Sequence, residues 1–409
     1  MANNFENTNL VTKIAVKEFL NAMQMLAKVD RQWNSSFKKV GNSIDIRRPV
    51  MFSANSGATF SAEDIQDAVT SLTLDQHKHV DFTITQVDLK LDVDEMTTRY
   101  IRPAMIELAQ QVETSIASEY TNIGNFSGTA GTTPATFLSV ANAKAVLDQI
   151  GVPDDGMTNG FFEPTAAVAL ADALKGVFPT QIAEKAIERA MIRELGGVTM
   201  FKNNSQPLHT VGTHGGTPLV NGATQNVTYA TATASKGWSQ TIITDGWTNS
   251  VTGILNAGDV ITIAGVNSVN RRTREDTGDL QTFTVTADAD SGASTGPSTL
   301  TISPPIITSG SYKTCSAAPA DNAAITVKTG TADASYRQNL IFHKNAITVG
   351  IAPLDVPVSG AESSMQSFDG VSISAVRQFD IDNYQTKFRF DILYGVRAQN
   401  PDFAIRLTS

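Results

Sequence analysis

The segment from residue 221 to residue 331 constrains the fold most, because it is rich in threonine and shows almost no helical periodicity. It contains 22 threonines and no histidine, and the short apolar runs VITIAGV, TFTVT, STLTI and AAITV are separated by Gly, Asp and Pro. Threonine and other β-branched residues favour strands, and closely spaced turn residues are typical of all-β structure. The sequence therefore predicts an inserted all-β, barrel-like domain over residues 220–332, large enough to have its own core.

The sequence on either side of this segment mixes helical and strand patterns. Apolar periodicity and capping residues predict helices, and alternation of apolar and polar residues predicts strands. The expected helices cover 8–29 (capped by Thr8 or Asn9), 94–119 (capped by Asp94), 136–150, 164–176 and 180–195. The expected strands cover 43–52, 79–93, 161–162, 198–202 and 386–392, and mixed α/β character returns over 338–357. The fold class is therefore α+β.

Two of these patterns have detail that the structure can test. The helix over 94–119 repeats apolar residues at spacings of three and four, which predicts a helix packed along one side; its stripe is Ile101, Met105, Leu108, Val112, Ile116 and Tyr120. The strands over 43–52 and 79–93 are joined by a long polar connection, and the second changes phase near Gln86. We interpret residues 43–93 as an arm that projects from the body.

The low charge content limits the possible partners. Charged residues make up 17% of the chain, against roughly a quarter in typical soluble domains. The net charge is −9, so there is no overall basic field to hold nucleic acid tightly.

The chain has one cysteine, Cys315, and therefore no internal disulfide. No signal peptide or membrane span is expected, and the chain is expected in the cytoplasm when it is made.

Possible catalytic or metal-binding residues are few and scattered. No phosphate-binding loop, nucleophile elbow or zinc motif is present. His77 and His79 share a strand face and could bind a metal, but a solvated pair is favoured. The remaining candidates have structural interpretations: His209 and His214 as turn residues or interdomain contacts, His343 as a buried histidine, Asp154 and Asp155 as a turn, and Cys315 as an unreactive thiol. We therefore predict no catalytic residue, no metal site and no cofactor.

The densest charge cluster lies within the threonine-rich segment. It contains Arg271, Arg272, Arg274, Glu275 and Asp276. The acids cancel the positive field that a nucleic-acid site needs. Two interpretations remain open: a solvated loop, or a mixed-charge contact between subunits that fixes their register.

The order of these elements resembles the major capsid proteins of tailed bacteriophages, in particular the short-tailed phage coat proteins with a β-rich insertion domain. The similarity is carried by GGVTMFKNNSQPLHTVG (196–212), GDVITIAGVNSV (258–269), LIFHKNAITV (340–349) and DILYGVRAQNPDFAIRL (391–407). It implies the tailed-phage and herpesvirus capsid fold. The implied parts are an amino-terminal helix and arm (1–42), an extended β-hairpin arm (43–93), a peripheral domain with a spine helix (94–134), an axial domain (135–219), the inserted barrel-like domain (220–332) and a carboxy-terminal part shared by the axial and peripheral domains (333–409).

The resemblance also implies a structural role and a set of partners. The subunit would assemble with itself into pentamers and hexamers of an icosahedral head, through a procapsid built with a scaffolding protein. A portal protein and encapsidated double-stranded DNA, held by weak non-specific contact, complete the implied partners, and no membrane is involved. The helix over residues 8–29 is where the resemblance would place scaffold contact, and the arm would lie over a neighbouring subunit.

Two other classes of function stay open at this point. The chain could be an enzyme whose site is assembled from His209, His214 and Asp154. It could instead be a surface adhesin that uses the threonine-rich module, although an adhesin needs a secretion signal.

Overall fold

The computed structural model describes residues 3–34, 42–54, 57–58, 60, 65–85, 97–174, 194–355 and 361–408. The chain forms two compact units, each assembled from three separate stretches. Unit 1 comprises Met1–Asp45, Ser71–Ile116 and Ile347–Arg397, and unit 2 comprises Ile46–Thr70, Ala117–Ala346 and Ala398–Ser409. The expected helix over 180–195, the phase change near Gln86 and the Asp94 cap all lie outside the described residues or at their masked border.

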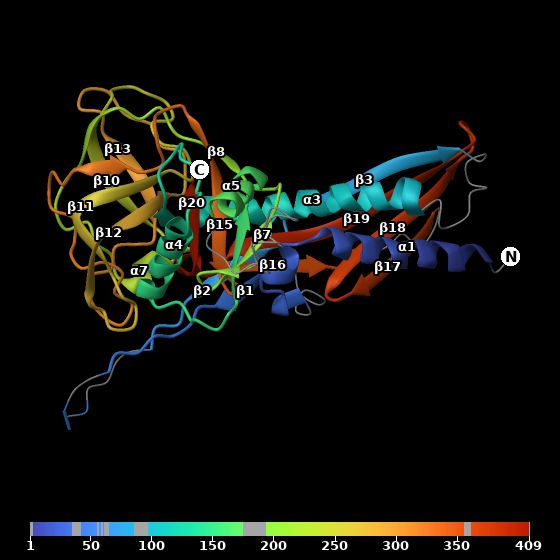
Figure 1. Ribbon diagram of the computed structural model, residues 1–409, viewed down its shortest axis with the longest axis horizontal. Coiled ribbons are helices and arrows are strands. Elements are labelled where there is room, and N and C mark those ends of the chain that lie inside the picture. Colours follow the sequence, from blue (N-terminus) through green and yellow to red (C-terminus); the bar gives the residue numbers. More distant parts are fainter. Residues whose placement is uncertain are drawn as a thin grey trace. The chain divides into compact units, whose positions relative to one another are not determined.

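Unit 1 is built on a five-stranded sheet. The strand order is β16 (Ile347–Ala352), β19 (Gln385–Ala398), β18 (Val371–Asp380) and β17 (Glu362–Phe368), and β3 (Gln76–Thr85) also pairs with β19. Helix α1 (Asn3–Ala22) packs against β17 and β18, and helix α3 (Arg102–Ser118) follows a short π-helix, η4 (Thr97–Ile101). Both helices run along the sheet in Figure 1.

The amino-terminal helix differs from its prediction at both ends. It begins at Asn3, so Thr8 and Asn9 lie inside it, and it ends at Ala22. The chain then turns before the short 3-10 helix η1 (Leu26–Lys28). Glu113 of α3 explains the early end, because its Oε1 accepts the backbone N–H groups of Gln24 and Met25. The periodicity could not reveal this carboxylate, which is distant in sequence.

The packed side of α3 agrees with the predicted stripe. Ile101, Met105, Leu108, Val112 and Ile116 are all buried. Pro103 is the second residue of α3, where its missing N–H would have no intrahelical partner. Tyr120 lies beyond the helix, in the 3-10 segment η5 (Glu119–Asn122), and is half-buried.

The expected pairing of the arm strands is wrong. β1 (Ser43–Arg47) pairs with β2 (Val69–Thr73), so the return strand begins ten residues before the predicted one. β3 instead pairs with β19, from Gln385↔Thr85 to Tyr394↔Gln76. Across this pair the ring of Phe82 stacks on that of Phe388, with 5.5 Å between centroids. Cross-strand aromatic contacts of this kind stabilise a sheet, which explains why β3 belongs to the body and not to the arm.

Unit 2 contains a seven-stranded sheet. Its order is β4 (Asn125–Ser127), β20 (Ala404–Thr408), β15 (Ser335–His343), β5 (Thr158–Phe162), β7 (Val198–Lys202) and β6 (Glu194–Leu195), and β8 (Leu208–Thr210) also pairs with β15. β5 and β7 run parallel, as do β4 and β20. In the β8–β15 pair, Thr210 lies opposite Ser335. The short 3-10 helix η6 (Pro401–Phe403) leads into β20.

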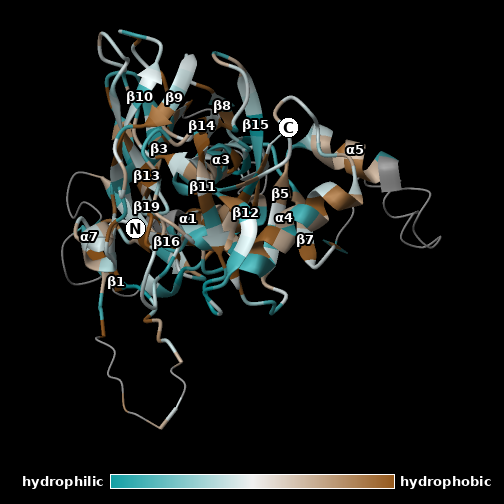
Figure 2. Ribbon diagram, turned by 90° about the vertical axis from the view of Figure 1, so that its left-hand side faces the viewer, coloured by the Kyte–Doolittle hydropathy of each residue, from teal (hydrophilic) through white to brown (hydrophobic). Residues whose placement is uncertain are grey.

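Helices α4 (Phe137–Ile150) and α5 (Pro164–Leu174) belong to the same unit. The side chain of Thr136 accepts the N–H of Ser139, and Gly151 ends α4 in the left-handed conformation with φ of 93°. The end at Gly151 confirms the predicted helix over 136–150, and Thr136 is the residue that caps its start. Hydrophilic and hydrophobic residues both occur along α4 (Figure 2), and its buried residues join Val198, Ile341 and Ile405 in one core.

The threonine-rich segment and β9 (Gly216–Val220), which directly precedes it, form a six-stranded sheet whose two edges meet; we call this sheet the barrel. The strand order is β14 (Ile325–Val327), β11 (Val260–Val269), β12 (Asp276–Val285), β13 (Ser298–Ser303), β10 (Gln240–Trp247) and β9. A bridge between Leu219 of β9 and Ala324, the residue before β14, joins the two edges of the sheet. Apolar side chains fill the interior, among them Ile242, Ile263, Phe283 and Leu300. One short helix, α7 (Tyr229–Thr233), interrupts the strands (Figure 1). Helices and mostly antiparallel sheets together confirm the α+β class.

Candidate functional site

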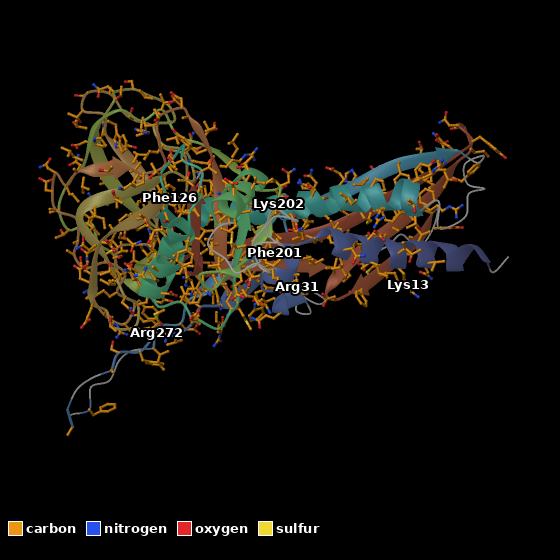
Figure 3. All side chains as sticks on the ribbon, in the orientation of Figure 1. Lys13, Arg31, Phe126, Phe201, Lys202 and Arg272 are labelled. Carbon is orange, nitrogen blue, oxygen red and sulfur yellow. The ribbon has the colours of Figure 1, made fainter. Side chains whose placement is uncertain are left out.

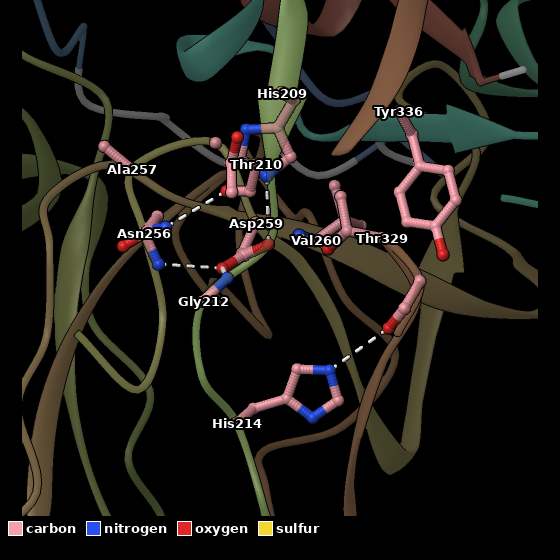
Figure 4. Close-up of polar contacts among 12 residues, drawn as sticks. His209, Thr210, Gly212, His214, Asn256, Ala257, Asp259, Val260, Thr329 and Tyr336 are labelled. Carbon is pink, nitrogen blue, oxygen red and sulfur yellow. Dashed lines mark hydrogen bonds and ion pairs between the residues drawn. The ribbon is translucent and has the colours of Figure 1, made fainter. Parts of the chain in front are cut away.

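A set of buried polar contacts in unit 2 centres on His209 and Asp259. His209 lies in β8 and is 2% exposed. Its Nε2 is 3.0 Å from Oδ1 of Asp259, and its Nδ1 is 3.0 Å from the hydroxyl of Tyr120. Figure 4 shows the imidazole directed at the Asp259 carboxylate. Each ring nitrogen therefore has a partner, and the histidine links η5, β8 and the start of β11.

Backbone donors complete the surroundings of Asp259. Its Oδ2 accepts the N–H of Gly212 at 3.0 Å and the N–H of Asn256 at 2.7 Å (Figure 4). Burial alone would raise the pKa of Asp259, but the hydrogen bonds from His209 and the two backbone groups outweigh it and hold the pKa below the usual value. The carboxylate therefore stays charged inside the unit at neutral pH.

Arg406 lies beside this network and is fully buried. Its Nη1 donates to the carbonyl oxygen of Gly258, and its Nη2 donates to Oγ1 of Thr284 at 3.3 Å. The guanidinium lies over the rings of Tyr120 and Phe126, at 5.6 and 6.0 Å from their centroids. Burial lowers the pKa of Arg406 to about 10. We call Tyr120, His209, Asp259 and Arg406 the buried network; it ties β20 and β8 to the barrel.

The sequence interpretation of His209 as a turn residue is wrong, because it lies in strand β8. The other interpretation, a contact between domains, agrees with its bond to Asp259 at the start of the barrel. His209 is a strand residue with two polar partners, and those partners lie 50 and 89 residues away. His214 is not part of the network, because its Nε2 contacts the carbonyl oxygen of Gly330 (Figure 4). The role of Arg406 was missed altogether. A lone arginine in the apolar strand AIRLT was the one available signal.

The other sequence candidates in unit 2 have structural partners. His343 is buried as predicted, and its Nε2 lies 3.1 Å from Asp155. Asp155 also accepts the N–H of Met157, as a turn residue does. Asp154 pairs with Lys144, which bonds Asp148 at 2.6 Å as well. The enzyme alternative required Asp154 close to His209 and His214; within the residues that the structure describes, no hydrogen bond or ion pair joins Asp154 to either histidine.

The histidine pair in unit 1 has acidic partners. His77 contacts Asp391 at 2.8 Å, and His79 contacts Asp81 at 3.3 Å. The centroids of the two imidazole rings are 6.0 Å apart. Among the described residues, no group of three or more His, Cys, Asp or Glu side chains is arranged to hold a metal ion.

The arginine cluster lies in a hydrogen-bonded turn between β11 and β12. Asn270 organises it, since its Oδ1 accepts the N–H groups of Arg272 and Thr273. Arg274 adopts a left-handed conformation with φ of 62°, which is uncommon for a residue with a side chain. Asp276 accepts the N–H of Gly278, and this hydrogen bond is the main reason that the pKa of Asp276 is lowered.

Two of the three arginines make contacts within their own chain. Arg271 is buried, and its guanidinium lies 3.6 Å from Asp402 and donates to the carbonyl oxygen of Lys313. Arg274 donates to the carbonyl oxygen of Phe52 at 2.7 Å. These two side chains therefore hold the turn against the arm and the carboxy-terminal segment, contacts that the sequence did not predict.

The other charged residues of the cluster face solvent. Arg272, Glu275 and Asp276 are exposed, and Figure 3 shows Arg272 near the place where the arm leaves unit 2. An open groove of about 320 Å³ lies here, lined by Arg272, Arg274 and apolar residues that include Phe52. The groove combines positive charge with an apolar floor.

Cys315 is buried inside the barrel. Burial raises the pKa of its thiol to about 11. A thiol with a raised pKa and no exposed surface is a poor nucleophile, which agrees with the sequence interpretation.

In the part of the chain that the structure describes, no helix has the length and apolar character needed to cross a bilayer.

A family model described as P22 coat protein, gene protein 5, matches residues 1–408. No curated protein sequence matches the chain. Solved structures similar to this chain include three from bacteriophages. The structure from Mycobacterium phage Che8 is 14% identical in sequence, with a TM-score of 0.47, and the match covers 94% of this chain and 90% of that one. The capsid of Ralstonia phage GP4 is 8% identical, with a TM-score of 0.45, and the match covers 95% of this chain and 87% of that one. The capsid of the cyanophage P-SCSP1u is 13% identical, with a TM-score of 0.40, and the match covers 90% of this chain and 83% of that one.

The family assignment rests on the family match, which spans all but the last residue of the chain. It confirms the resemblance to tailed-phage capsid proteins, and it means that the contacts described above belong to a subunit whose role is structural. The chain belongs to the P22 coat protein family and is a phage major capsid protein, which associates with copies of itself to form the shell of the virion.

Proposed function

We propose that the subunit assembles into pentamers and hexamers of an icosahedral head that encloses double-stranded DNA, through a procapsid made with a scaffolding protein. The family match over residues 1–408 carries this proposal. In the host cytoplasm, scaffold and portal proteins would join the subunit during assembly. The net charge of −9 supports a shell that contains DNA through weak, non-specific contact.

Exposed apolar residues on the arm support contact between subunits. Phe60 is 90% exposed, and Phe52 and Ile65 are also exposed. Large apolar side chains that are exposed on a projecting segment are typical of surfaces covered by a partner. We therefore assign the arm to a neighbouring subunit, and we assign the exposed residues Arg272, Glu275 and Asp276 to a charged contact between subunits. Arg271 and Arg274, with their internal partners, act indirectly by holding the turn.

The domain plan also belongs to the proposal. The barrel, whose two edges are joined at Leu219 and Ala324, supports an inserted domain near residues 220–332. Helix α1 remains our candidate for scaffold contact; its exposed Lys13 and Lys17 would meet an acidic surface. Lys13 is labelled in Figure 3.

We also propose that the subunit has no enzymatic activity. His209 and Asp259 are too deeply buried to reach a substrate, and their polar atoms are occupied by internal partners. A general acid or base must come within hydrogen-bond reach of a reacting group, and these two residues cannot.

Expression of the chain with and without a scaffolding protein tests the proposal. Sedimentation and electron microscopy of the lysates should show closed shells of uniform size with scaffold, and aberrant or few particles without it. Monomers or small oligomers under every condition, with scaffold present, would contradict the proposed assembly.

A further inference from the structure

A small cavity in unit 2 is lined by two buried arginines and a wall of aromatic rings. Its volume is about 70 Å³. Arg48 comes from the base of the arm, Arg271 from the barrel and Asp402 from the carboxy-terminal segment. The cavity is separate from the buried network, and its aromatic wall consists of Tyr229, Trp238 and Tyr312.

The aromatic wall is held in place by ring contacts. Tyr229 stacks on Tyr312 with 3.6 Å between centroids, and it meets Trp238 edge-on at 5.8 Å. Arg48 lies over the Trp238 ring, with its Cζ 4.5 Å from the centroid. The hydroxyl of Tyr312 accepts the N–H of Met51 and donates to the carbonyl oxygen of Gln66. Side chains fixed in this way form a site that is organised before any ligand arrives.

The two guanidinium groups have too few acceptors for their charge. Arg48 and Arg271 are each 9% exposed. Arg48 has the Tyr229 hydroxyl as a hydrogen-bond partner and donates to Oγ1 of Thr70 at 3.4 Å, a long bond. Arg271 donates to the carbonyl oxygen of Lys313 at 3.3 Å and has Asp402 at 3.6 Å. Each guanidinium carries five N–H donors, and one carboxylate faces two positive charges.

Two specific donors in the lining residues have no acceptor, one within a guanidinium group and one in the aromatic wall. Nε of Arg271 and Nε1 of Trp238 are buried and make no hydrogen bond within the described part of the chain. Buried polar groups are normally paired, because leaving one unpaired costs free energy. The cavity lining therefore has more hydrogen-bond donors than acceptors and more positive than negative charge. A bound anion supplies both the missing acceptors and the missing negative charge.

We propose that this cavity binds one small tetrahedral oxyanion of the phosphate or sulfate class. A cavity of about 10–15 Å³ by the same measure holds one water molecule, so this cavity has room for a guest with several heavy atoms. The oxyanion accepts hydrogen bonds from Arg48, Arg271 and Trp238, and it balances the second guanidinium charge. By joining residues of the arm base, the barrel and the carboxy-terminal segment, it fixes the base of the arm. The inference does not depend on the proposed shell geometry.

Equilibrium dialysis of the purified full-length protein against radiolabelled inorganic phosphate, at pH 7 and constant ionic strength in chloride, tests the site. We expect saturable binding of one phosphate per chain, with sulfate as a competitor. Arg48→Gln and Arg271→Gln should each weaken binding at least about tenfold. Arg272→Gln is the matched control, because Arg272 is exposed on the same turn and does not line the cavity; it should bind phosphate as the unmodified chain does.

Asp402→Asn distinguishes a binding site from a purely structural cluster. Removal of the competing carboxylate should tighten phosphate binding, whereas a structural role alone would leave the affinity unchanged. Thermal unfolding gives a second readout: phosphate should raise the Tm of the unmodified protein to a plateau, and in Arg48→Gln only the non-saturating effect of an excluded salt should remain.

Three outcomes would overturn the proposal. They are no saturable binding to the unmodified protein up to about 10 mM phosphate, equal affinity in the unmodified protein and the folded Arg48→Gln variant, and equal or weaker binding by Asp402→Asn. If circular dichroism shows that neither glutamine variant folds, two other results test the proposal. They are the number of phosphates bound per unmodified chain and the phosphate affinity of Asp402→Asn relative to the unmodified protein.

Discussion

Nη1 of Arg406 donates a 2.6 Å hydrogen bond to the carbonyl oxygen of Gly258, across 148 residues of sequence. The guanidinium thus joins the last strand of the chain to the turn that precedes β11. Because Arg406 is fully buried, its contacts are shielded from solvent and cannot be replaced by water without opening the structure.

Arg406→Met should therefore destabilise the subunit severely. The variant leaves the carbonyl of Gly258 without the guanidinium donor, and the Thr284 hydroxyl keeps only its bond to the carbonyl of Thr121. We expect a loss of about 3 kcal/mol in the free energy of unfolding. Urea unfolding of the isolated subunit measures it. Arg272→Met, at an exposed site, should change the free energy by less than about 0.5 kcal/mol; equal effects of the two variants would contradict the role of Arg406.

Asp259→Asn should remove part of the dependence of stability on pH. The pKa of Asp259 is lower in the folded protein than its usual value of 3.8. A carboxyl with a lowered folded pKa stabilises the protein above its unfolded pKa, and this stabilisation disappears as the pH falls through the folded pKa. The variant should lose about 1–3 kcal/mol at pH 7, and the difference from the unmodified protein should narrow below about pH 4. Urea midpoints from pH 7 to pH 3 measure both; a constant difference would refute the assignment.

The arginine cluster should separate into folding and assembly residues. Arg271→Ala removes a buried contact with Asp402 and should lower the stability of the subunit by about 1–3 kcal/mol. Arg272→Glu should leave stability within about 0.5 kcal/mol but reduce the yield of shells in scaffold-assisted assembly. For both variants, sedimentation of assembly reactions measures the yield of shells, and urea unfolding of the same preparations measures stability. Normal yield from Arg272→Glu would show that the exposed residues of the turn are only solvated.

Phe60→Ser should impair assembly without harming the subunit. The side chain is 90% exposed, so folding gains little from it. Contact with a neighbouring subunit would be lost, and fewer or less stable shells should form. Phe60→Leu keeps an apolar side chain and should restore most of the yield. Electron microscopy and sedimentation after scaffold-assisted assembly measure the yield of shells. A yield from Phe60→Ser equal to that of the unmodified protein would exclude a contact at this residue.

Cys315 should be unreactive in the folded subunit. The thiol is buried and its pKa is raised to about 11, so almost no thiolate is present at pH 8. A colorimetric disulfide reagent should label no thiol in native protein over minutes and one thiol per chain in guanidinium chloride. Fast labelling of native protein would show that the barrel opens around Cys315.

The sequence predicts an element well where its determinants lie within the element. α4 is an example, because Thr136 caps one end and Gly151 adopts the left-handed conformation at the other. The apolar stripe of α3 and the strand patterns of the barrel are similar cases, since periodicity alone reports which face is buried. These patterns needed no knowledge of distant residues.

Errors and omissions occur where a distant residue decides the outcome. The end of α1 depends on Glu113, the pairing of β3 depends on the aromatic residues of β19, and the burial of His209 depends on Asp259. Arg406 lies in a strand whose five residues are all buried, although an arginine there would ordinarily face solvent. Its acceptors come from residues 258 and 284, and nothing near Arg406 in sequence indicates them.

The pairing of β8 with β15 has a consequence for the engineering of the subunit. Thr210 and Ser335 face each other in register, and their hydroxyls are 2.8 Å apart. In topological terms, everything between them is one very long hairpin loop, which a two-residue turn could replace. A minimal subunit made by excision of the segment between them should therefore need no rerouting of the remaining strands. It does need a change at Arg406, because the acceptors of that guanidinium would leave with the excised segment.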